Sequence, residues 1–484
     1  MSQVVLDGGP LSISDVVKVA QGALVSITPE AKQRANQSRA VLQSREASRE
    51  LIYGVNTGFG PLKSERISES DRVKLQENLI ASHAVGVGQA LPQESVRAAM
   101  LLLAASHLRG HSGVGPEAAE LICELLNKNE LPHVPAQGSL GASGDLAPLA
   151  HIALFLQQNK LQLYSKMGLA LINGTHFHTG IAVLIAHEAL ALCKAADIAC
   201  AMNAEAMLCS AKPFLDKVHE LRPHQGQRDS AQNIERLLAG SELVLSHRDC
   251  QEVQDAYSIR CAPQVHGVSR TATDHLSDFL SVELSSVTDN PLVIGEEVIS
   301  AGHFHGQPIA AALDYFKIGI SALANVSERR TERVLNKDLN RGLPAFLTEH
   351  PGLNSGMMIC QYTAAALVAE NKVLSHPSSV DSIPTGANQE DHVSMAMNAA
   401  LHAQRVLENV RRVLKIELLV AAQALDCRAS IQSERPGAGV IAAWEAVRTM
   451  SPKLEVDRSL HKDIEELSLN TVIEAVESQI GALL

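Results

Sequence analysis

One stretch of this sequence decides the fold and the chemistry: Gly138-Ser139-Leu140-Gly141-Ala142-Ser143-Gly144-Asp145-Leu146-Ala147-Pro148-Leu149-Ala150-His151. At its centre, glycine at position 144 tolerates the strained dihedrals that bring its nitrogen back to the Ala142 carbonyl. Ring closure with loss of water, together with loss of the Ser143 hydroxyl, would leave a methylene group conjugated to a carbonyl. The chain would then carry its own electrophile, a group that proteins usually borrow from a cofactor.

The residues that follow the triplet predict how it is held. Asp145 is expected to cap a helix, and Pro148 is tolerated in the first turn of that helix. The positive end of the helix would favour negative charge that develops nearby. A flexible turn before a helix is the alternative interpretation of Ala142-Ser143-Gly144 taken alone, because so short a pattern also arises by chance.

The composition favours a mainly helical protein. The chain has 484 residues, of which 46% are hydrophobic and only 3% aromatic. That length allows two or three domain-sized units. Alanine and leucine in place of aromatic side chains suit closely packed long helices better than a sandwich of sheets. Helices are predicted over residues 11–51, 71–86, 94–110, 116–127, 309–335, 354–374, 401–425 and 440–449.

Charge and cysteine usage exclude several classes of partner. The net charge of −12 argues against general binding of nucleic acids, which leaves a basic footprint. The 8 cysteines form no Cys-x-x-Cys pair and are expected to be reduced thiols in a cytoplasmic protein. The first residues lack the basic start and apolar run of a signal peptide, and no apolar run reaches the ~18 residues of a membrane span.

The whole stretch from Gly138 to His151 resembles the signature of the aromatic amino acid ammonia-lyases. In that family the triplet matching Ala142-Ser143-Gly144 cyclises without help to 4-methylidene-imidazol-5-one, so the resemblance implies this prosthetic group and no external cofactor. It also implies the ammonia-lyase/fumarase-like fold, a long central helical bundle with an N-terminal mixed domain that carries the group. We place the boundary at residues 222–227, giving domains 1–221 and 222–484. The resemblance further implies a homotetramer whose active sites draw on more than one subunit.

Three motifs of the N-terminal part resemble active-site segments of the family. The glycine-rich octet that begins at Tyr53 is similar to the family's mobile loop, whose tyrosine is a catalytic base, although an isolated tyrosine on such a loop is usually a packing residue. His83 matches a histidine that contacts the substrate ring in histidine and tyrosine ammonia-lyases and that phenylalanine ammonia-lyases generally lack. Asn173, in Leu171-Ile172-Asn173-Gly174-Thr175, matches an active-site asparagine.

Two later motifs complete the predicted site. In the segment from Gln254 to Gln264, the resemblance assigns Gln254, Tyr257 and Arg260 to the active site. An arginine suits a substrate carboxylate because its fork donates two parallel hydrogen bonds, whereas an isolated arginine would be interpreted as part of a surface ion pair. Glu390, in Asn388-Gln389-Glu390-Asp391-His392, matches the histidine ammonia-lyase version of a segment that tyrosine-specific relatives change.

The sequence departs from the family pattern at a few positions. Met167 stands where a glutamate is common, the connection over residues 158–167 is short, and His303 replaces a usual asparagine. His303 and His305 would suggest a metal site, but no carboxylate or cysteine stands at ligand spacing, so we predict no metal.

These observations favour elimination of ammonia from L-histidine to give trans-urocanate. The alternative within the family is a tyrosine or phenylalanine ammonia-lyase or an aminomutase. A non-catalytic helical oligomer would be free to lose Tyr53 or the triplet, and both are intact. A serine hydrolase is excluded because its nucleophile elbow needs Gly-x-Ser-x-Gly, and Asp145 occupies the last glycine position.

Overall fold

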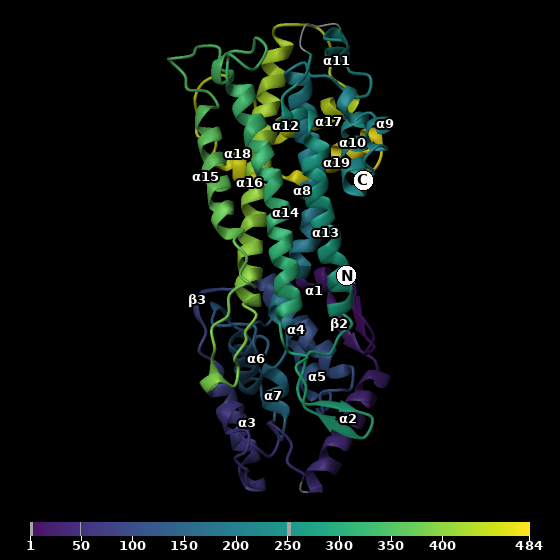
Figure 1. Cartoon of the computed structure of the whole chain (residues 1–484), viewed down its shortest axis with the longest axis vertical. Coiled ribbons are helices and arrows are strands. Elements are labelled where there is room, and N and C mark those ends of the chain that lie inside the picture. The colour runs from purple at the N-terminus through teal and green to yellow at the C-terminus, as the bar shows by residue number, and fades with distance from the viewer. Residues whose placement is uncertain (1–2, 49, 249–252) are drawn as a thin grey trace. The chain divides into compact units, whose positions relative to one another are not determined.

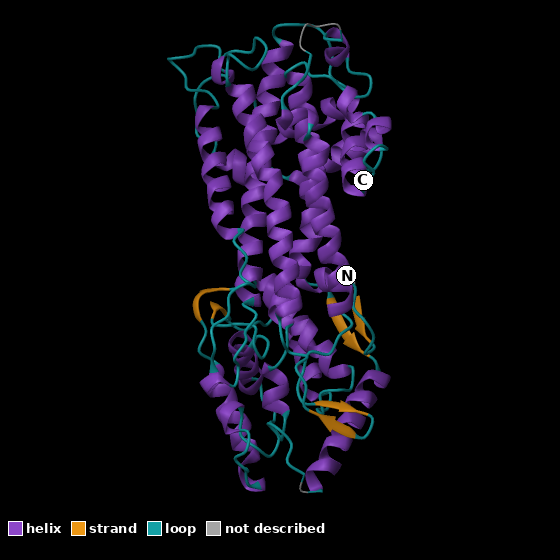
Figure 2. Ribbon diagram, viewed as in Figure 1, coloured by secondary structure: helices purple, strands orange, loops and turns teal. Residues whose placement is uncertain are grey.

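Stretches rich in alanine and leucine form long helices, as the composition predicts, and loops connect them to three short sheets (Figure 2). The computed structural model describes residues 3–48, 50–248 and 253–484. The chain divides into two compact units. The first contains Met1–His187, Leu276–Asp314 and Pro377–Gln404, and the second contains Glu188–His275, Tyr315–His376 and Arg405–Leu484. The domain boundary at residues 222–227 stays a prediction.

The first unit combines helices with all three described sheets. Helix α4 is buried along almost its whole length, from Ser95 to Leu108, and it packs against α1 and α5. Strands β1 and β2 pair in parallel, while β3 with β4 and β5 with β6 pair antiparallel. The elements are α1 (Ile13–Ala20), α2 (Pro29–Ala47), α3 (Arg72–His83), α4 (Gln93–Leu108), α5 (Glu117–Lys128), α6 (Leu146–Gln158), α7 (Met167–Ile172), β1 (Gln3–Leu6), β2 (Leu24–Ile27), β3 (Val87–Ala90), β4 (Pro135–Gln137), β5 (Leu292–Ile294) and β6 (Glu297–Ile299).

The prediction of one helix over residues 11–51 is wrong at residues 24–27, which form strand β2. Strand β2 interrupts it, and Val25 is buried in register with the buried Val4 of β1. Ser12 caps α1 by accepting from the Asp15 nitrogen, and Thr28 caps α2 by accepting from the Ala31 nitrogen. Each of the two helices therefore begins at its own capping residue, and residues 11–51 do not form one continuous helix.

The second unit is almost entirely helical. Helices with residues in both units are α8 (His176–Ala206), α13 (Ala262–Glu283), α14 (Gln307–Leu335) and α16 (Ala396–Ala429). The others of the second unit are α9 (Asp216–His219), α10 (Gln225–Leu237), α11 (Glu242–Ser246), α12 (Tyr257–Arg260), α15 (Met358–Leu374), α17 (Ala438–Met450), α18 (His461–Glu466) and α19 (Leu469–Ile480).

A buried charge network joins α8, α13, α14 and α16 inside the second unit, where the four helices run alongside one another (Figure 1). Arg330 Nε donates to Glu417 Oε1 at 2.5 Å, and its Nη2 donates to Glu417 Oε2 at 2.9 Å. His266 Nδ1 lies 2.7 Å from Asp197 Oδ1. Burial opposes the charge of Arg330, but the facing Glu417 carboxylate raises the pKa of the guanidinium above its ordinary value.

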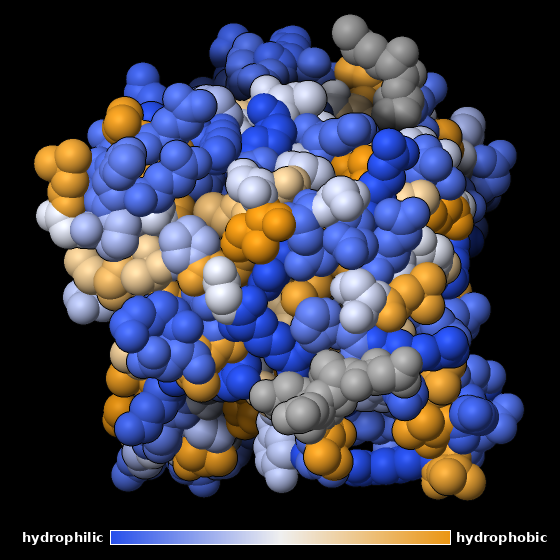
Figure 3. All heavy atoms as spheres, turned by 90° about the horizontal axis from the view of Figure 1, so that it is seen from above, coloured by the Kyte–Doolittle hydropathy of each residue, from blue (hydrophilic) through white to orange (hydrophobic). Residues whose placement is uncertain are grey.

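Hydrophobic surface is limited on the face shown in Figure 3, which is mainly hydrophilic with hydrophobic side chains in separate groups. Among the described residues, one helix, α14, is long and apolar enough to cross a membrane by length and composition. Of its most apolar window, 67% is buried inside the protein, which is what the core helix of a folded domain shows.

Replacing Arg330 by methionine tests the charge network. Arg330→Met leaves the Glu417 carboxylate buried without its partner, so the free energy of unfolding should fall by about 3–5 kcal/mol in denaturant titrations. The matched control is Arg405→Met, which removes an exposed pair with Glu370 and should cost about 0–1 kcal/mol. Equal losses of unfolding free energy in the two variants would contradict the conclusion that the Arg330 and Glu417 pair depends on its burial.

Candidate active site

The triplet lies in a tight turn that only glycine permits at its third position. Gly144 has a φ of +78° and forms an isolated parallel bridge with Gly174. A Cβ atom added to Gly144 would lie 2.0 Å from the Gly174 carbonyl oxygen. The next residue, Asp145, donates its backbone N–H to that same oxygen at 2.7 Å. The turn is therefore fixed against the segment that follows α7, and the backbone of Gly144 has a left-handed conformation that glycine adopts without strain.

The prediction that the Asp145 side chain caps the following helix is wrong. Asp145 occupies the position before α6, but its side chain makes no capping bond to that helix. Its carboxylate instead accepts from the nitrogens of Phe177 and His178, at 2.9 and 3.0 Å, at the start of α8. The other oxygen accepts from Ser139 Oγ at 2.9 Å. The carboxylate therefore ties the triplet to the first turn of a neighbouring helix, which sequence spacing alone does not reveal.

Asp145 keeps its charge although it is fully buried. Burial alone would raise the pKa of its carboxyl group, but the electrostatic interaction with the adjacent His178 ring and the hydrogen bonds from His178 and Ser139 hold that pKa below the ordinary value. His178 Nδ1 lies 3.0 Å from Asp145 Oδ1. A fixed negative charge therefore sits directly after the triplet.

Glu390 lies beside the triplet in the structure. Ser143 Oγ donates to Glu390 Oε1 at 2.9 Å, and Thr385 Oγ1 donates to Glu390 Oε2 at 2.6 Å. The backbones of Thr385 and Glu390 also pair with each other. Both carboxylate oxygens therefore have donors, and one of these donors belongs to the triplet. Nearby, Ser394 Oγ donates to the Gly141 carbonyl at 2.9 Å, which holds the other side of the turn.

Tyr53 lies on its glycine-rich loop in the same unit. The Gly60 nitrogen donates to the Tyr53 hydroxyl at 3.1 Å, and the Tyr53 ring meets Phe59 edge to face. Lys63 Nζ, just after the loop, donates to Gln389 Oε1 at 2.6 Å. This bond brings the loop to the residue that directly precedes Glu390.

His83 and Asn173 each have one side-chain atom already held by the backbone. His83, the last residue of α3, places Nδ1 2.8 Å from the Leu79 carbonyl. Because a carbonyl only accepts, Nδ1 carries the hydrogen, and Nε2 is an acceptor in the neutral ring. Asn173 is buried and donates Nδ2 to the Asn290 carbonyl at 3.2 Å. Its Oδ1 remains as an acceptor, one residue before Gly174.

The other three predicted site residues lie together in the second unit. Arg260 Nη2 donates to Gln254 Oε1 at 2.7 Å, and the Arg260 guanidinium lies over the Tyr257 ring, 4.6 Å from its centroid. The Tyr257 side chain is 71% exposed. The structure thus brings Ala142, Ser143, Gly144 and Glu390 into contact in one unit, and Gln254, Tyr257 and Arg260 into contact in the other.

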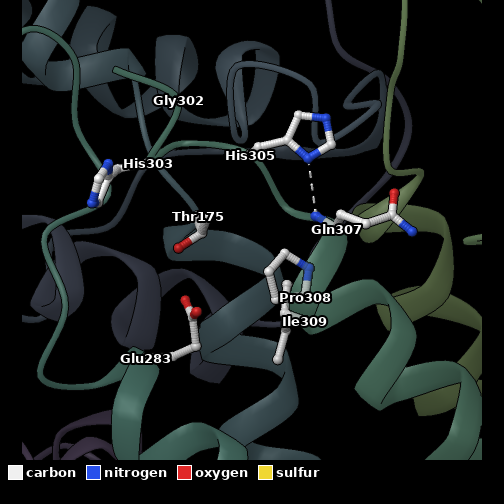
Figure 4. A pocket seen from close by; sticks show the side chains of 8 residues that line it. All are labelled: Thr175, Glu283, Gly302, His303, His305, Gln307, Pro308 and Ile309. Atoms are coloured by element: carbon white, nitrogen blue, oxygen red, sulfur yellow. Dashed lines mark hydrogen bonds between the residues drawn. The ribbon is translucent and has the colours of Figure 1, made fainter. Parts of the chain in front are cut away.

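A separate cavity of about 440 Å³ lies in the first unit (Figure 4). In it, the Thr175 hydroxyl and the Glu283 carboxylate point toward each other, and burial raises the pKa of Glu283. None of the predicted site residues lines it. Its lining is Thr175, Glu283, Gly302, His303, His305, Gln307, Pro308 and Ile309. Among the described residues, no group of three or more histidine, cysteine or acidic side chains could hold a metal ion.

Comparison with known proteins decides the family. The profile of the aromatic amino acid lyases matches residues 11–160 and 156–449. The chain belongs to this family. It is 46% identical to the histidine ammonia-lyase of Gloeobacter violaceus, over 99% of this chain and 98% of that protein. The structure is similar to that of a tyrosine aminomutase from Streptomyces globisporus, with a TM-score of 0.91, 36% identity and 99% of each chain covered. It is also similar to a histidine ammonia-lyase from Trypanosoma cruzi, with a TM-score of 0.89, 38% identity, and 99% and 96% covered.

Family membership confirms the predicted fold class and the predicted enzyme class, an ammonia-lyase built on the ammonia-lyase/fumarase-like fold. Sequence reasoning missed the side chains that hold the site. Thr385 and Lys63 gave no signal, since a threonine and a lysine in a loop are normally interpreted as surface residues.

The Asp145 carboxylate should make stability depend on pH. Its pKa is depressed in the folded protein, so its contribution is present above the unfolded value of about 3.9 and is lost as pH falls through the folded pKa. Asp145→Asn should therefore lower the free energy of unfolding by about 3 kcal/mol at pH 7, and the difference from the wild type should shrink below about pH 4.

The control for this prediction is Asp391→Asn, which changes an exposed aspartate a few residues from Ser394. Its unfolding free energy should follow that of the wild type at every pH. A difference in unfolding free energy between Asp145→Asn and the wild type that stays constant down to pH 3 would show that the charge of Asp145 does not contribute to stability.

Proposed function

We propose that this chain is a histidine ammonia-lyase, which eliminates ammonia from L-histidine and releases trans-urocanate. One observation carries the substrate assignment: the Glu390 carboxylate lies in hydrogen-bond contact with the Ser143 hydroxyl of the triplet. A neutral imidazole presents one N–H donor and one acceptor nitrogen, and a carboxylate forms a charge-assisted bond with that donor. The relative from Gloeobacter violaceus, named a histidine ammonia-lyase and similar over nearly its full length, also supports the proposal.

We further propose that Ala142, Ser143 and Gly144 mature to 4-methylidene-imidazol-5-one, with no external cofactor. The residues fit this group. Gly144 already has a left-handed φ of +78°, and a Cβ at that position would meet backbone. Once formed, the group supplies an electrophile for the substrate's amino group, which makes ammonia a better leaving group.

The side chains of the first unit have distinct proposed roles. Tyr53 is the base that removes the substrate's β-proton, which is weakly acidic and needs a well-placed base. Glu390 accepts from the substrate imidazole, and His83, with its free Nε2, faces the same ring. Asn173 offers Oδ1 to the amino group or to the prosthetic ring. Ser143 provides the methylene carbon.

The side chains of the second unit bind the other end of the substrate. Arg260 holds the carboxylate, because its guanidinium can donate two parallel bonds. Gln254, already bonded to Arg260, hydrogen-bonds the substrate or the prosthetic ring. Tyr257 stabilises the amino group or the ring of the substrate.

We propose a cytoplasmic homotetramer with shared active sites. A catalytic tyrosine that is 71% exposed in a single chain, as Tyr257 is, supports a site completed by another subunit. The second unit also exposes large hydrophobic side chains on three of its long helices, and such residues mark interfaces when they form patches. They are Val268, Tyr315, Ile318, Ile359, Tyr362 and Val373.

Substrate preference tests the proposed function. Purified protein should release urocanate from L-histidine, with little coumarate from L-tyrosine or cinnamate from L-phenylalanine, because buried polar groups left unpaired against a phenyl ring reject it by roughly 10⁴- to 10⁵-fold. Glu390→Ala should lower kcat/KM far more for L-histidine than for L-tyrosine or L-phenylalanine. The measurement is ultraviolet absorbance of each product.

Glu283→Ala provides the matched control, since Glu283 is a half-buried carboxylate of the same unit that lines the separate cavity. It should leave the preference for histidine unchanged. A wild-type enzyme that prefers tyrosine at equal concentration would contradict the proposal and favour a tyrosine lyase or an aminomutase, the function named for the Streptomyces globisporus structure.

Removing the Tyr53 hydroxyl tests the assignment of the base. Tyr53→Phe keeps the ring contact with Phe59 and should lower kcat by about 10²- to 10⁴-fold in steady-state assays. Tyr164→Phe is the control, because Tyr164 also accepts from a backbone N–H in this unit, that of Gly115. Near-normal turnover by Tyr53→Phe would assign the base elsewhere.

A further inference from the structure

Lys166 is a fully buried cation that the proposed mechanism does not use. It stands directly before α7, with a φ of +73° that is uncommon for a residue other than glycine. Its Nζ donates to Asp289 Oδ1 at 2.7 Å and to the Asn290 carbonyl at 3.1 Å. Burial lowers the pKa of Lys166, and the Asp289 carboxylate opposes that shift.

The amide of Asn173 shares both of these acceptors. Asn173 Nδ2 donates to Asp289 Oδ1 and to the Asn290 carbonyl, each at 3.2 Å. Lys166 precedes the six-residue helix α7 and Asn173 follows it, so the two side chains meet the same pair of oxygens from opposite ends of one helix. Reversing the amide would place Asn173 Oδ1 against a carboxylate. The negative oxygen therefore fixes which way the amide points.

The held amide lies beside the triplet. Gly174, the residue after Asn173, accepts from the Asp145 nitrogen at 2.7 Å and forms the isolated bridge with Gly144. A change in the rotamer of Asn173 would therefore change which atom, an acceptor or a donor, is presented next to the reacting centre.

Stability does not explain this ion pair. Replacing a buried pair by well-packed apolar side chains is often neutral or stabilising. Asp289 Oδ2 is moreover buried without a hydrogen-bond partner among the described residues, so the pair leaves one costly atom unsatisfied. A lysine kept under these conditions points to a role in the arrangement of its neighbours.

We propose that Lys166 is a positioning residue, which acts through Asp289 to orient the Asn173 amide so that Oδ1 faces the substrate's amino group. This inference rests on the proposed function, in which Asn173 contacts the reacting groups. Lys166 itself touches no reacting atom. Its effect on catalysis therefore passes entirely through Asn173.

A double-mutant cycle tests this dependence. Lys166→Met should lower kcat/KM for L-histidine by about 10²-fold, the scale of a small misplacement of a catalytic group. The double variant Lys166→Met/Asn173→Ala should be no slower than Asn173→Ala alone, because Lys166 has nothing left to orient. A merely structural lysine would give losses that multiply, and that result would overturn the proposal.

Lys317→Met is the matched control, since Lys317 is a fully buried lysine of the second unit that donates to the His376 carbonyl. In the double variant Lys317→Met/Asn173→Ala, the fold-loss of kcat/KM should be the product of the losses in the two single variants. If Lys166→Met does not fold, Lys166→Met/Asp289→Leu takes its place, because it leaves no unpaired buried charge.

Mass spectrometry of each variant separates positioning from maturation. The triplet of Lys166→Met should have lost two waters like that of the wild type, and an unmodified triplet would overturn the proposal. Wild-type activity on histidine is measured first. If it is absent, the proposed function fails, and the same cycle run with L-tyrosine still decides whether the Lys166 and Asn173 effects are coupled.

Discussion

The close approach of two backbone segments, the turn at Gly144 and the segment at Gly174, is the constraint on which the site depends. The gap between them holds no Cβ atom, since one added to Gly144 would lie 2.0 Å from the Gly174 oxygen. The contact fixes a left-handed backbone in the triplet and sets the adjacent Asn173 beside it. The buried Asp145 carboxylate then joins the same turn to the start of α8 through two backbone N–H groups.

Three carboxylates, of which Asp145 and Asp289 are buried and Glu390 is half-buried, organise the rest of the site. Asp145 fixes the triplet, Glu390 receives donors from Ser143 and Thr385, and Asp289 receives donors from Lys166 and Asn173. A charged acceptor shielded from water forms stronger hydrogen bonds than a neutral one and tolerates few alternative arrangements. Each of these carboxylates thus limits the conformations of a side chain or turn that the proposed chemistry requires.

The sequence predicts the fold class and the enzyme class, because these follow from one long motif and from a resemblance that spans the chain. The same resemblance assigns Glu390 to the active site, and in the structure its carboxylate accepts from Ser143 of the triplet. Prediction from the sequence fails where the partner of a side chain or the conformation of a segment depends on tertiary contacts. The partner of Asp145 lies more than thirty residues away in the sequence, on α8. The sequence predicts a helix where strand β2 forms, because four residues of strand carry little periodicity of their own and pairing with β1 decides their conformation. A lysine before a short helix gives no sign in the sequence that it is buried.

The mass of one peptide tests the central claim, that this turn converts its own residues into an electrophile. Trypsin should release residues 129–160, which contain the triplet, as a single peptide, because it cleaves after Lys128 and Lys160 and no lysine or arginine lies between them. In the wild-type protein this peptide should be lighter than its sequence by two waters, one from ring closure and one from Ser143. In Gly144→Ala, whose added Cβ the turn cannot hold, it should keep its full mass. A wild-type peptide of full mass from active enzyme would contradict the account.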